Sequence, residues 1–171
     1  MDRRRSHPVP QTNRRGLSFY EGPSPAEDRI GRKRLNQSAG IPVGGDESCT
    51  RLSDVARELT DGIAHMISIK TARTGFTESR RILALCEGLS TPVVMGSQGD
   101  SMVGTLGTLN FGAAFRLSSI RPAEVTNFLE LSDDLLTNPL IIADGRLNAT
   151  EGPGMGIEID EDKLKRYRID Q

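Results

Sequence analysis

The segment IPVGGDESCTRLSDVARELTDGIAHMISIK, residues 41–70, reads as one complete strand–helix–strand unit. The apolar run IPVGG is followed by Asp46, and the apolar run MISI is followed by Lys70. Between them lies the pattern of an amphipathic helix, carried by Leu52, Val55, Ala56 and Leu59. Two strands joined by a helix of this length pair in parallel through a right-handed crossover, so the segment predicts α/β architecture.

The same unit repeats on both sides of this segment. Upstream, the run GLSFY ends at Glu21, and downstream the run TPVVMG ends at Gly96. The steps from Glu21 to Asp46, Lys70 and Gly96 are 25, 24 and 26 residues. An interval of this size fits one strand, one helix and their loops, and the repeat places all four strand ends at one edge of a parallel sheet. That edge is where α/β barrels keep their functional groups.

The remaining segments complete the pattern up to Pro139. Helices are expected at AEDRIGRKRLNQSAG (26–40), ESRRILALCEGL (78–89) and MVGTLGTLNFGAAF (102–115), and a last strand is expected at VTNFLEL (125–131). With the strands described above, these elements predict a partial (β/α) barrel over residues 16–138.

The two ends of the chain differ from this pattern. Residues 1–15 combine arginines and prolines without apolar periodicity, which indicates a basic leader without ordered structure. After Pro139, Asp144-Gly145 is a hairpin signal, and glycines interrupt the stretch that follows. Residues 139–171 are therefore expected to form an extended strap, closed by a helical turn in EDKLKRYRID.

Composition excludes several classes of protein. The 22 basic and 23 acidic residues give a net charge of −1, which provides no general attraction to nucleic acid or to an anionic membrane. No apolar run reaches the ~18 residues of a membrane span, and no secretory signal is recognisable, so a cytoplasmic protein is expected. Cys49 and Cys86 lack the spacing of a zinc site or a disulfide framework and are expected to be reduced thiols.

Two carboxylates stand at adjacent strand ends. Glu21 and Asp46 would converge at the sheet edge, and oxygen ligands of this kind favour Mg²⁺. The alternative is that both acids cap the helices that follow them, and Ser53 is an equal candidate for the second cap.

Lys70 and Asp100 are the other candidates for chemistry. At the mouth of a buried strand a lysine can serve as a base; the alternatives are an exposed strand-end lysine or a structural partner for Asp46. Asp100 lies in GSQGDSMVG (96–104), a loop that opens a helix and whose backbone N–H groups could hold an anionic oxygen. His7 and His65 lie away from the strand ends and are expected to be structural or solvated.

These motifs resemble the mandelate racemase/muconate lactonizing enzyme family of the enolase superfamily. FYEGPSPAED resembles its fourth barrel strand, IPVGGDES its fifth, ISIKTARTGFTES its sixth and GSQGDSMVGT its seventh, while GPGMGIEIDEDKL resembles its closing segment. The resemblance covers roughly residues 16–168 in the family's order. It implies strands four to eight of a TIM-type barrel, with a C-terminal strap.

The resemblance also implies a chemistry. Glu21 and Asp46 would be Mg²⁺ ligands, Lys70 the residue that moves the proton alpha to a carboxylate, and Asp100 an acid near the substrate. An enediolate formed in this way leads to dehydration, racemisation or cycloisomerisation of a small carboxylic acid. The sequences KTARTGF and GSQGDS resemble those of sugar-acid or hydroxyproline-type dehydratases and racemases more than those of cycloisomerases.

The chain also departs from the family pattern. The family's second-strand Lys-x-Lys, its third-strand aspartate and its N-terminal capping domain have no counterpart in this sequence, and Gly22 replaces the usual glutamine after the metal-binding glutamate. Open sheet edges favour a homo-oligomer or pairing with another chain. The leading interpretation is therefore an enzyme of this superfamily represented by a C-terminal barrel fragment or a truncated gene product. Two other interpretations stay open: a non-catalytic remnant that pairs with another chain, and a flavodoxin-like binding module.

Overall fold

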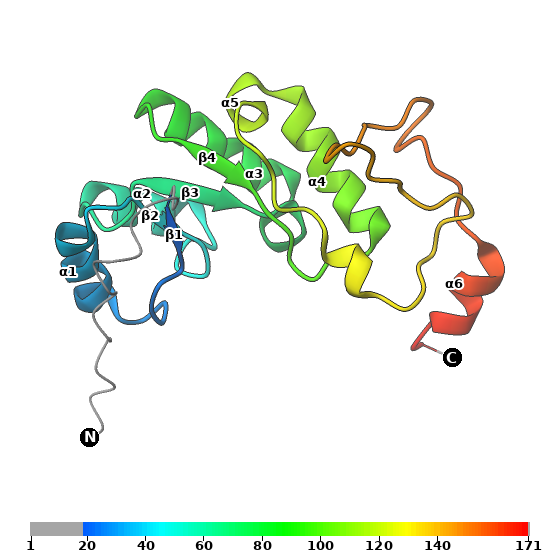
Figure 1. Cartoon of the computed structure of the whole chain (residues 1–171), viewed down its shortest axis with the longest axis horizontal. Helices are drawn as coiled ribbons and strands as arrows, with labels where there is room; N and C mark the ends of the chain where they lie inside the picture. Colours follow the sequence, from blue (N-terminus) through cyan, green and yellow to red (C-terminus); the bar gives the residue numbers. More distant parts are fainter. Residues whose placement is uncertain (1–18, 171) are drawn as a thin grey trace. The chain divides into compact units, whose positions relative to one another are not determined.

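A computed structural model of the chain describes residues 19–170, and the predicted basic leader lies outside this range. The chain alternates short strands and helices (Figure 1). Four strands form a sheet in the order β1-β2-β3-β4, and the pairs β1–β2 and β2–β3 are parallel. The sequential order confirms the α/β prediction and contradicts the flavodoxin-like alternative, whose strand order is not sequential.

The elements follow the predicted repeat as far as the fourth helix. In chain order they are β1 (Tyr20–Glu21), α1 (Arg29–Ala39), β2 (Val43–Gly45), α2 (Leu52–Thr60), β3 (Met66–Ile69), α3 (Thr71–Gly88), β4 (Val93–Met95), α4 (Met102–Ala114), α5 (Arg116–Ser119), the 3₁₀ helix η2 (Asn127–Glu130) and α6 (Glu161–Tyr167). They belong to two compact units. The first unit comprises residues 19–69 with Arg80–Val93, and the second comprises Lys70–Ser79 with residues 94–170.

Two adjacent glycines set the packing of β2 in the first unit. A Cβ atom at Gly44 would lie 3.3 Å from the Phe19 ring and 3.5 Å from the side chain of Met66. A Cβ at Gly45 would lie only 2.5 Å from Cys49 Sγ, on the other face of the sheet. Because both faces approach the backbone so closely, neither position has room for a larger residue without displacing its neighbours.

A buried ion pair joins α1 and α2 in the first unit. Arg32 donates from Nη2 to Glu58 Oε1 at 2.7 Å, and both side chains are almost fully buried. Arg32 Nη1 also donates to the carbonyl of Pro25, at 2.7 Å, and to that of Ala26. Charges removed from water in this way require such partners, so the pair fixes how the two helices meet.

The second unit contains less regular structure. Helix α4 contributes buried residues such as Leu106 and Phe111, and Phe111 stacks on Phe76 with ring centroids 6.4 Å apart. Asp144 and Gly145 form the predicted hairpin turn, with both residues at positive φ and paired backbone hydrogen bonds between Ala143 and Arg146. The predicted C-terminal helical turn is also confirmed as α6, which begins after its N-cap, Asp160.

The structure corrects two predicted elements. Residues 125–131 do not form a strand: η2 lies there, and the strand-like contact nearest to it is a one-residue parallel bridge between Gly96 and Glu124. The helix predicted to begin at Glu78 begins at Thr71, with a kink at Gly75, whose φ of 69° and ψ of 165° are not helical. Glycine tolerates this backbone conformation better than other residues.

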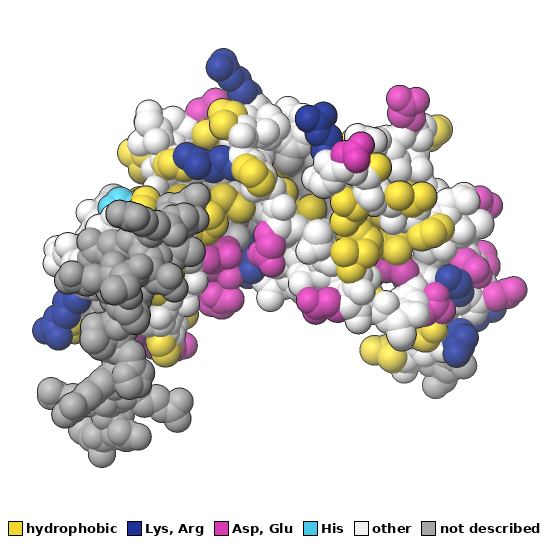
Figure 2. Space-filling model, viewed as in Figure 1, with side chains coloured by type: hydrophobic (Ala, Val, Ile, Leu, Met, Phe, Trp, Pro, Cys, Tyr) yellow, Lys and Arg dark blue, Asp and Glu magenta, His cyan; other side chains and the backbone are white. Residues whose placement is uncertain are grey.

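Hydrophobic side chains gather on the face of the second unit drawn in Figure 2, over α4 and the strap. Ile141 is 76% exposed, and Ile120, Leu129 and Leu131 are also exposed. Clusters of exposed apolar side chains are typical of surfaces that another protein segment covers. Among residues 19–170 no helix is long and apolar enough to cross a membrane.

Candidate functional site

Glu21 and Asp46 stand at the ends of neighbouring parallel strands in the first unit. Glu21 is the last residue of β1 and pairs with Gly44, and Asp46 directly follows the last residue of β2. The register of the next pair joins Gly44 with Met66, so Met66 and Ser68 lie on the same face of the sheet as Gly44. The two acids therefore follow the same edge of the sheet.

Both carboxylates are held close to the backbone. Asp46 is 4% exposed, and its carbonyl accepts a hydrogen bond from the Cys49 N–H at 2.8 Å, which closes the turn after β2. Glu21 Oε1 is buried and accepts no hydrogen bond within the described part of the chain. A buried carboxylate oxygen without a donor is well suited to a cation.

The structure answers the helix-capping alternative in part. Helix α1 is capped by Asp28, whose Oδ1 accepts from the Gly31 N–H at 2.8 Å, so Glu21 is not its cap. The N-cap residue of α2 is Arg51, whose side chain makes no capping hydrogen bond, so Ser53 does not stand at the N-cap position.

Glu47 explains why glycine stands at position 22. Gly22 has a φ of +46°, and a Cβ atom there would lie 2.8 Å from Glu47 Oε2. The carboxylate of Glu47 therefore occupies the space that a side chain at position 22 would need. The replacement of the family's glutamine by Gly22 and the position of Glu47 belong together.

Lys70 follows β3 directly and is the first residue of the second unit. It is 8% exposed, so the alternative of an exposed strand-end lysine is wrong. Its carbonyl accepts from the N–H groups of Arg73 and Thr74 and from Thr74 Oγ1, all within 3.1 Å. The first turn of α3 thus fixes the backbone of Lys70 at the point where the strand becomes a helix.

Asp100 also lies in the second unit, in the loop before α4. It is 6% exposed, and its Oδ2 accepts no hydrogen bond within residues 19–170. A Cβ atom at Gly104 would lie 3.1 Å from Asp100 Cβ, so the glycine leaves room for the aspartate against the first turn of α4. Asp100 is therefore a buried acid with one oxygen available for a ligand.

Two N–H groups at this loop donate to side chains of the same unit, one of them the carboxylate of Asp134. The N–H of Gly99 donates to Asn127 Oδ1 at 3.2 Å, and the N–H of Met102 donates to Asp134 Oδ2 at 2.7 Å. Side chains of the same unit therefore take these two donors. Partners so distant in sequence leave no local pattern from which they could be predicted.

The residues in the first unit fit a hard divalent cation. Two acids follow adjacent parallel strands, and one oxygen of Glu21 is buried without a donor among the described residues, which matches the oxygen ligands that Mg²⁺ prefers. Within residues 19–170 no group of three or more His, Cys, Asp or Glu side chains is placed to hold a metal ion. Further ligands would therefore come from water, a substrate or residues outside this range, as is common for Mg²⁺.

Comparison with known proteins identifies the family. Residues 9–163 match the family described as Enolase C-terminal domain-like, which is most of the chain. The chain belongs to this family. The resemblance found in the strand-end motifs and the partial barrel are thereby confirmed.

The relatives of this enolase C-terminal domain-like chain include cycloisomerases. It is 28% identical over 160 residues to muconate cycloisomerase 1 of Rhodococcus opacus, covering 93% of this chain and 43% of the relative. It is 27% identical to o-succinylbenzoate synthase of Geobacillus kaustophilus, covering 89% of this chain and 40% of the relative. The chain thus spans less than half the length of these relatives.

Solved structures give the same result. The structure of a muconate lactonizing enzyme from Mycobacterium smegmatis matches with a TM-score of 0.87 and 51% identity, covering 91% of this chain and 44% of that one. Muconate cycloisomerase from Pseudomonas fluorescens matches with a TM-score of 0.83 and 27% identity, covering 91% and 43%. Both similarities extend over nearly the whole of this chain.

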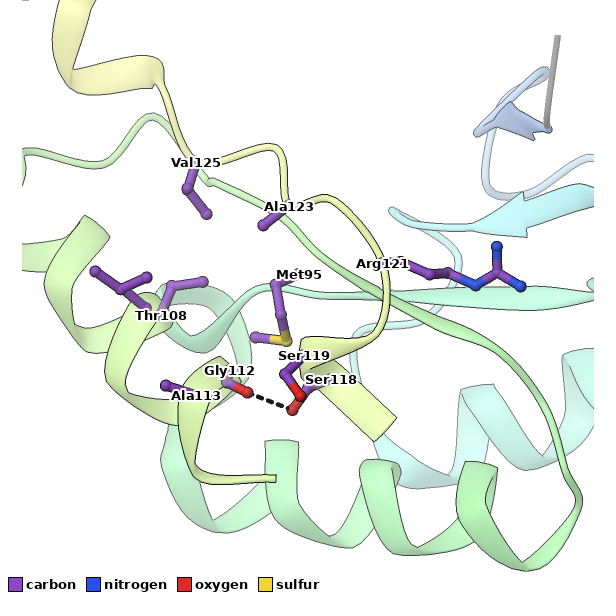
Figure 3. A pocket seen from close by; sticks show the side chains of 10 residues that line it. Met95, Thr108, Gly112, Ala113, Ser118, Ser119, Arg121, Ala123 and Val125 are labelled. Carbon is purple, nitrogen blue, oxygen red and sulfur yellow. Dashed lines mark hydrogen bonds between the residues drawn. The ribbon is translucent and has the colours of Figure 1, made fainter. Parts of the chain in front are cut away.

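A separate hollow in the second unit does not have the chemistry of the candidate site. Its volume is about 230 Å³, and it lies among α4, α5 and the segment that follows them (Figure 3). Met95, Gly112 and Val125 contribute to its walls, and Ser118 Oγ donates to the Gly112 carbonyl at 2.9 Å. None of the four predicted site residues lines it.

The two cysteines and His65 have structural surroundings. Cys49 and Cys86 are buried free thiols, as predicted, and burial raises the pKa of Cys86 to about 12, with a smaller contribution from Cys49. His65 Nδ1 accepts from the Val43 N–H at 3.3 Å and so supports the pairing of β2 and β3.

Sequence reasoning missed residues that act through tertiary contacts. They are Glu47 beside Gly22, Asn127 and Asp134 beside the Asp100 loop, and the ion pair of Arg32 with Glu58. The available signals were indirect. Gly22 directly follows the candidate acid Glu21, and a glycine at such a position indicates that another group approaches closely.

Proposed function

We propose that this chain supplies the metal-binding and proton-transferring part of a cycloisomerase-type active site. The substrate class is a small dicarboxylic acid or its lactone, of the kind named for the muconate cycloisomerase and muconate lactonizing relatives. The observation that carries the proposal is the register of β1 and β2: Glu21 ends β1 and pairs with Gly44, two residues before Asp46. The 51% identity to a muconate lactonizing enzyme supports the reaction class.

Each residue has a distinct role in this proposal. Glu21 and Asp46 hold Mg²⁺, and the cation supplies positive charge beside the substrate carboxylate, which makes the adjacent proton easier to remove. Lys70 accepts or returns that proton. It is buried and directly follows β3, two residues beyond Ser68, so it stands at a strand end as the two acids do. Asp100 faces the substrate with the oxygen that has no donor among residues 19–170.

The proposed reaction class differs from the one that the sequence motifs favoured. KTARTGF and GSQGDS favoured sugar-acid or hydroxyproline-type dehydratases and racemases, whereas the relatives include muconate and chloromuconate cycloisomerases. Cycloisomerisation is therefore the proposed outcome of the proton transfer. The three outcomes share the first step and differ in what happens to the electron pair afterwards.

A second candidate is a non-catalytic role in which the chain pairs with another chain. One observation favours it: the second unit exposes apolar side chains such as Ile141. In this case the four site residues would be inherited from an active ancestor without carrying out the reaction.

Deuterium exchange tests the proposal. The purified chain is incubated with muconolactone and Mg²⁺ in D₂O, and ¹H NMR follows the proton alpha to the carboxylate. We expect exchange that stops with EDTA and in Lys70→Met, while Lys33→Met, which changes an exposed lysine of α1, retains the wild-type rate. Absence of exchange in the wild-type chain would favour the non-catalytic candidate, and wild-type rates in Lys70→Met would overturn the assignment of the base.

A further inference from the structure

The loop that carries Asp100 is held by a later segment of the second unit. Ser97 Oγ donates to the Glu124 carbonyl at 3.1 Å, at the base of the loop. Further along, the Gly99 N–H donates to Asn127 Oδ1 and the Met102 N–H donates to Asp134 Oδ2. Asp100 thus lies between two backbone groups that are fixed by side chains 28 and 32 residues further along the chain.

We propose that Asn127 and Asp134 are positioning residues for Asp100. The inference rests on the proposed function, in which Asp100 faces the substrate. Within the described residues Asp100 Oδ2 has no hydrogen-bond donor, so the orientation of the Asp100 side chain is not set by hydrogen bonds to that oxygen. Its direction instead follows from the backbone on either side and from packing against Gly104. Fixing the two neighbouring N–H groups fixes that backbone.

Asp134 also replaces the usual cap of α4. Ser101 stands at the N-cap position, yet its side chain makes no capping hydrogen bond. The carboxylate of Asp134 instead accepts from Met102 at 2.7 Å, where its negative charge favours the positive end of the helix. Because this bond is shorter and charge-assisted, Asp134 should contribute more than Asn127, whose bond is 3.2 Å long.

The segment that presents Asp134 is itself anchored. Asp134 Oδ1 accepts from the Leu135 N–H at 2.7 Å, and the Leu135 carbonyl accepts from the Asp160 N–H at 2.8 Å. Leu136 forms an antiparallel bridge with Ile159. The strap and the start of α6 therefore hold the carboxylate in place, which a positioning residue requires.

The test compares matched variants of the full 171-residue chain. Asp134→Ala and Asn127→Ala remove the acceptors, Asp134→Asn and Asn127→Asp keep an oxygen in place, and Ser101→Ala is the control. Amide hydrogen exchange of Gly99 and Met102 reports on the loop, and the kcat and KM of α-proton exchange on muconolactone report on Asp100. Circular dichroism confirms that each variant folds.

We expect Asp134→Ala to accelerate exchange of the Met102 amide about tenfold, with a lower kcat and an unchanged KM. Asn127→Ala should do the same more weakly at Gly99. The oxygen-keeping variants should restore most of the loss, and Ser101→Ala should match the wild type.

Two results would overturn the inference: an effect of Ser101→Ala equal to that of Asp134→Ala, or amide exchange that rises equally across the second unit. If the wild-type chain shows no α-proton exchange, the proposed function fails. The amide exchange and its rescue then decide separately whether these side chains hold the loop.

Discussion

The two regions that carry the candidate residues are stabilised in different ways. Residues 19–69 place Glu21 and Asp46 with regular strands and helices packed around buried side chains such as Val43, Val55 and Ile67. Residues 94–137 place Asp100 with single hydrogen bonds to Asn127 and Asp134 and little strand pairing. The proposed metal ligands therefore depend on the core, whereas Asp100 depends on individual polar contacts.

The largest expected effect breaks the core of the first region. Glu58→Gln leaves Arg32 buried without its counter-charge, and removal of one member of a buried pair costs about 3–5 kcal/mol in the free energy of unfolding. Urea unfolding followed by circular dichroism measures the loss. The control is Arg57→Ala, which removes the exposed ion pair with Asp54 and should cost less than about 1 kcal/mol. Equal losses in the two variants would contradict a core-dependent first region.

A smaller effect is expected from filling the space beside β2. Gly45→Val brings side-chain atoms against Cys49 Sγ and should destabilise the chain by about 1–3 kcal/mol. Gly88→Ala is the matched control, because no atom lies within 4 Å of the place its new Cβ would take and alanine favours the helix by about 1 kcal/mol. The same unfolding experiment compares them. A neutral Gly45→Val variant would show that the turn after β2 is not closely packed.

The contact between Asp133 and the helix α6 of the strap should weaken in acid. Asp133 accepts from Lys163 Nζ at 2.8 Å and from the Tyr167 hydroxyl at 2.9 Å, and these hydrogen bonds lower the pKa of Asp133 from 3.8 to about 2. Because the folded pKa is the lower one, this contribution to stability is complete above about pH 4 and is lost as the pH falls through 2. Amide exchange of α6 between pH 2 and 6 measures it.

Two variants sharpen that measurement. Asp133→Asn should remove most of the acid-dependent loss of protection in α6, whereas Asp162→Asn, at an exposed position of the same helix, should keep it. Identical profiles for Asp133→Asn and the wild type would contradict the assignment. The pKa values of Lys163 and Tyr167 are raised, chiefly by the same hydrogen bonds to Asp133, so their contributions are lost only at alkaline pH above their ordinary values.

The smallest expected effect is an absence of reaction in the first unit. Cys49 and Cys86 are buried, and burial raises the pKa of Cys86 to about 12, so iodoacetamide at pH 8 should leave both thiols unmodified in the folded chain. Mass spectrometry before and after addition of urea measures this directly. Rapid modification without urea would contradict the close packing of the first unit.

Local periodicity explains how much of the fold was predictable. The strands β2 to β4 and the helices α1, α2 and α4 follow apolar patterns within single segments, so the sequence predicted them within a few residues. VTNFLEL failed because its buried residues, Val125 and Phe128, lie three apart, which is a helical spacing, while Leu129 and Leu131 are exposed. A strand would bury alternate residues.

The candidate site was predictable only in part for the same reason. Glu21, Asp46 and Lys70 were found because they end apolar runs, and Asp100 because its loop follows one. Asn127, Asp134 and Glu47 act through contacts that no local pattern encodes. Asp134 lies 32 residues after its partner, Met102. The approach of Glu47 is indicated only by the glycine at position 22.

Binding of Mn²⁺, measured by electron paramagnetic resonance on the 171-residue chain, tests most directly whether the first region is the metal-binding half of an active site. We predict binding that weakens at least about tenfold in both Glu21→Gln and Asp46→Asn, because each loses a charged ligand, and that is unchanged in Asp54→Asn. Equal affinity in all four proteins, or no binding by the wild-type chain, would contradict the account.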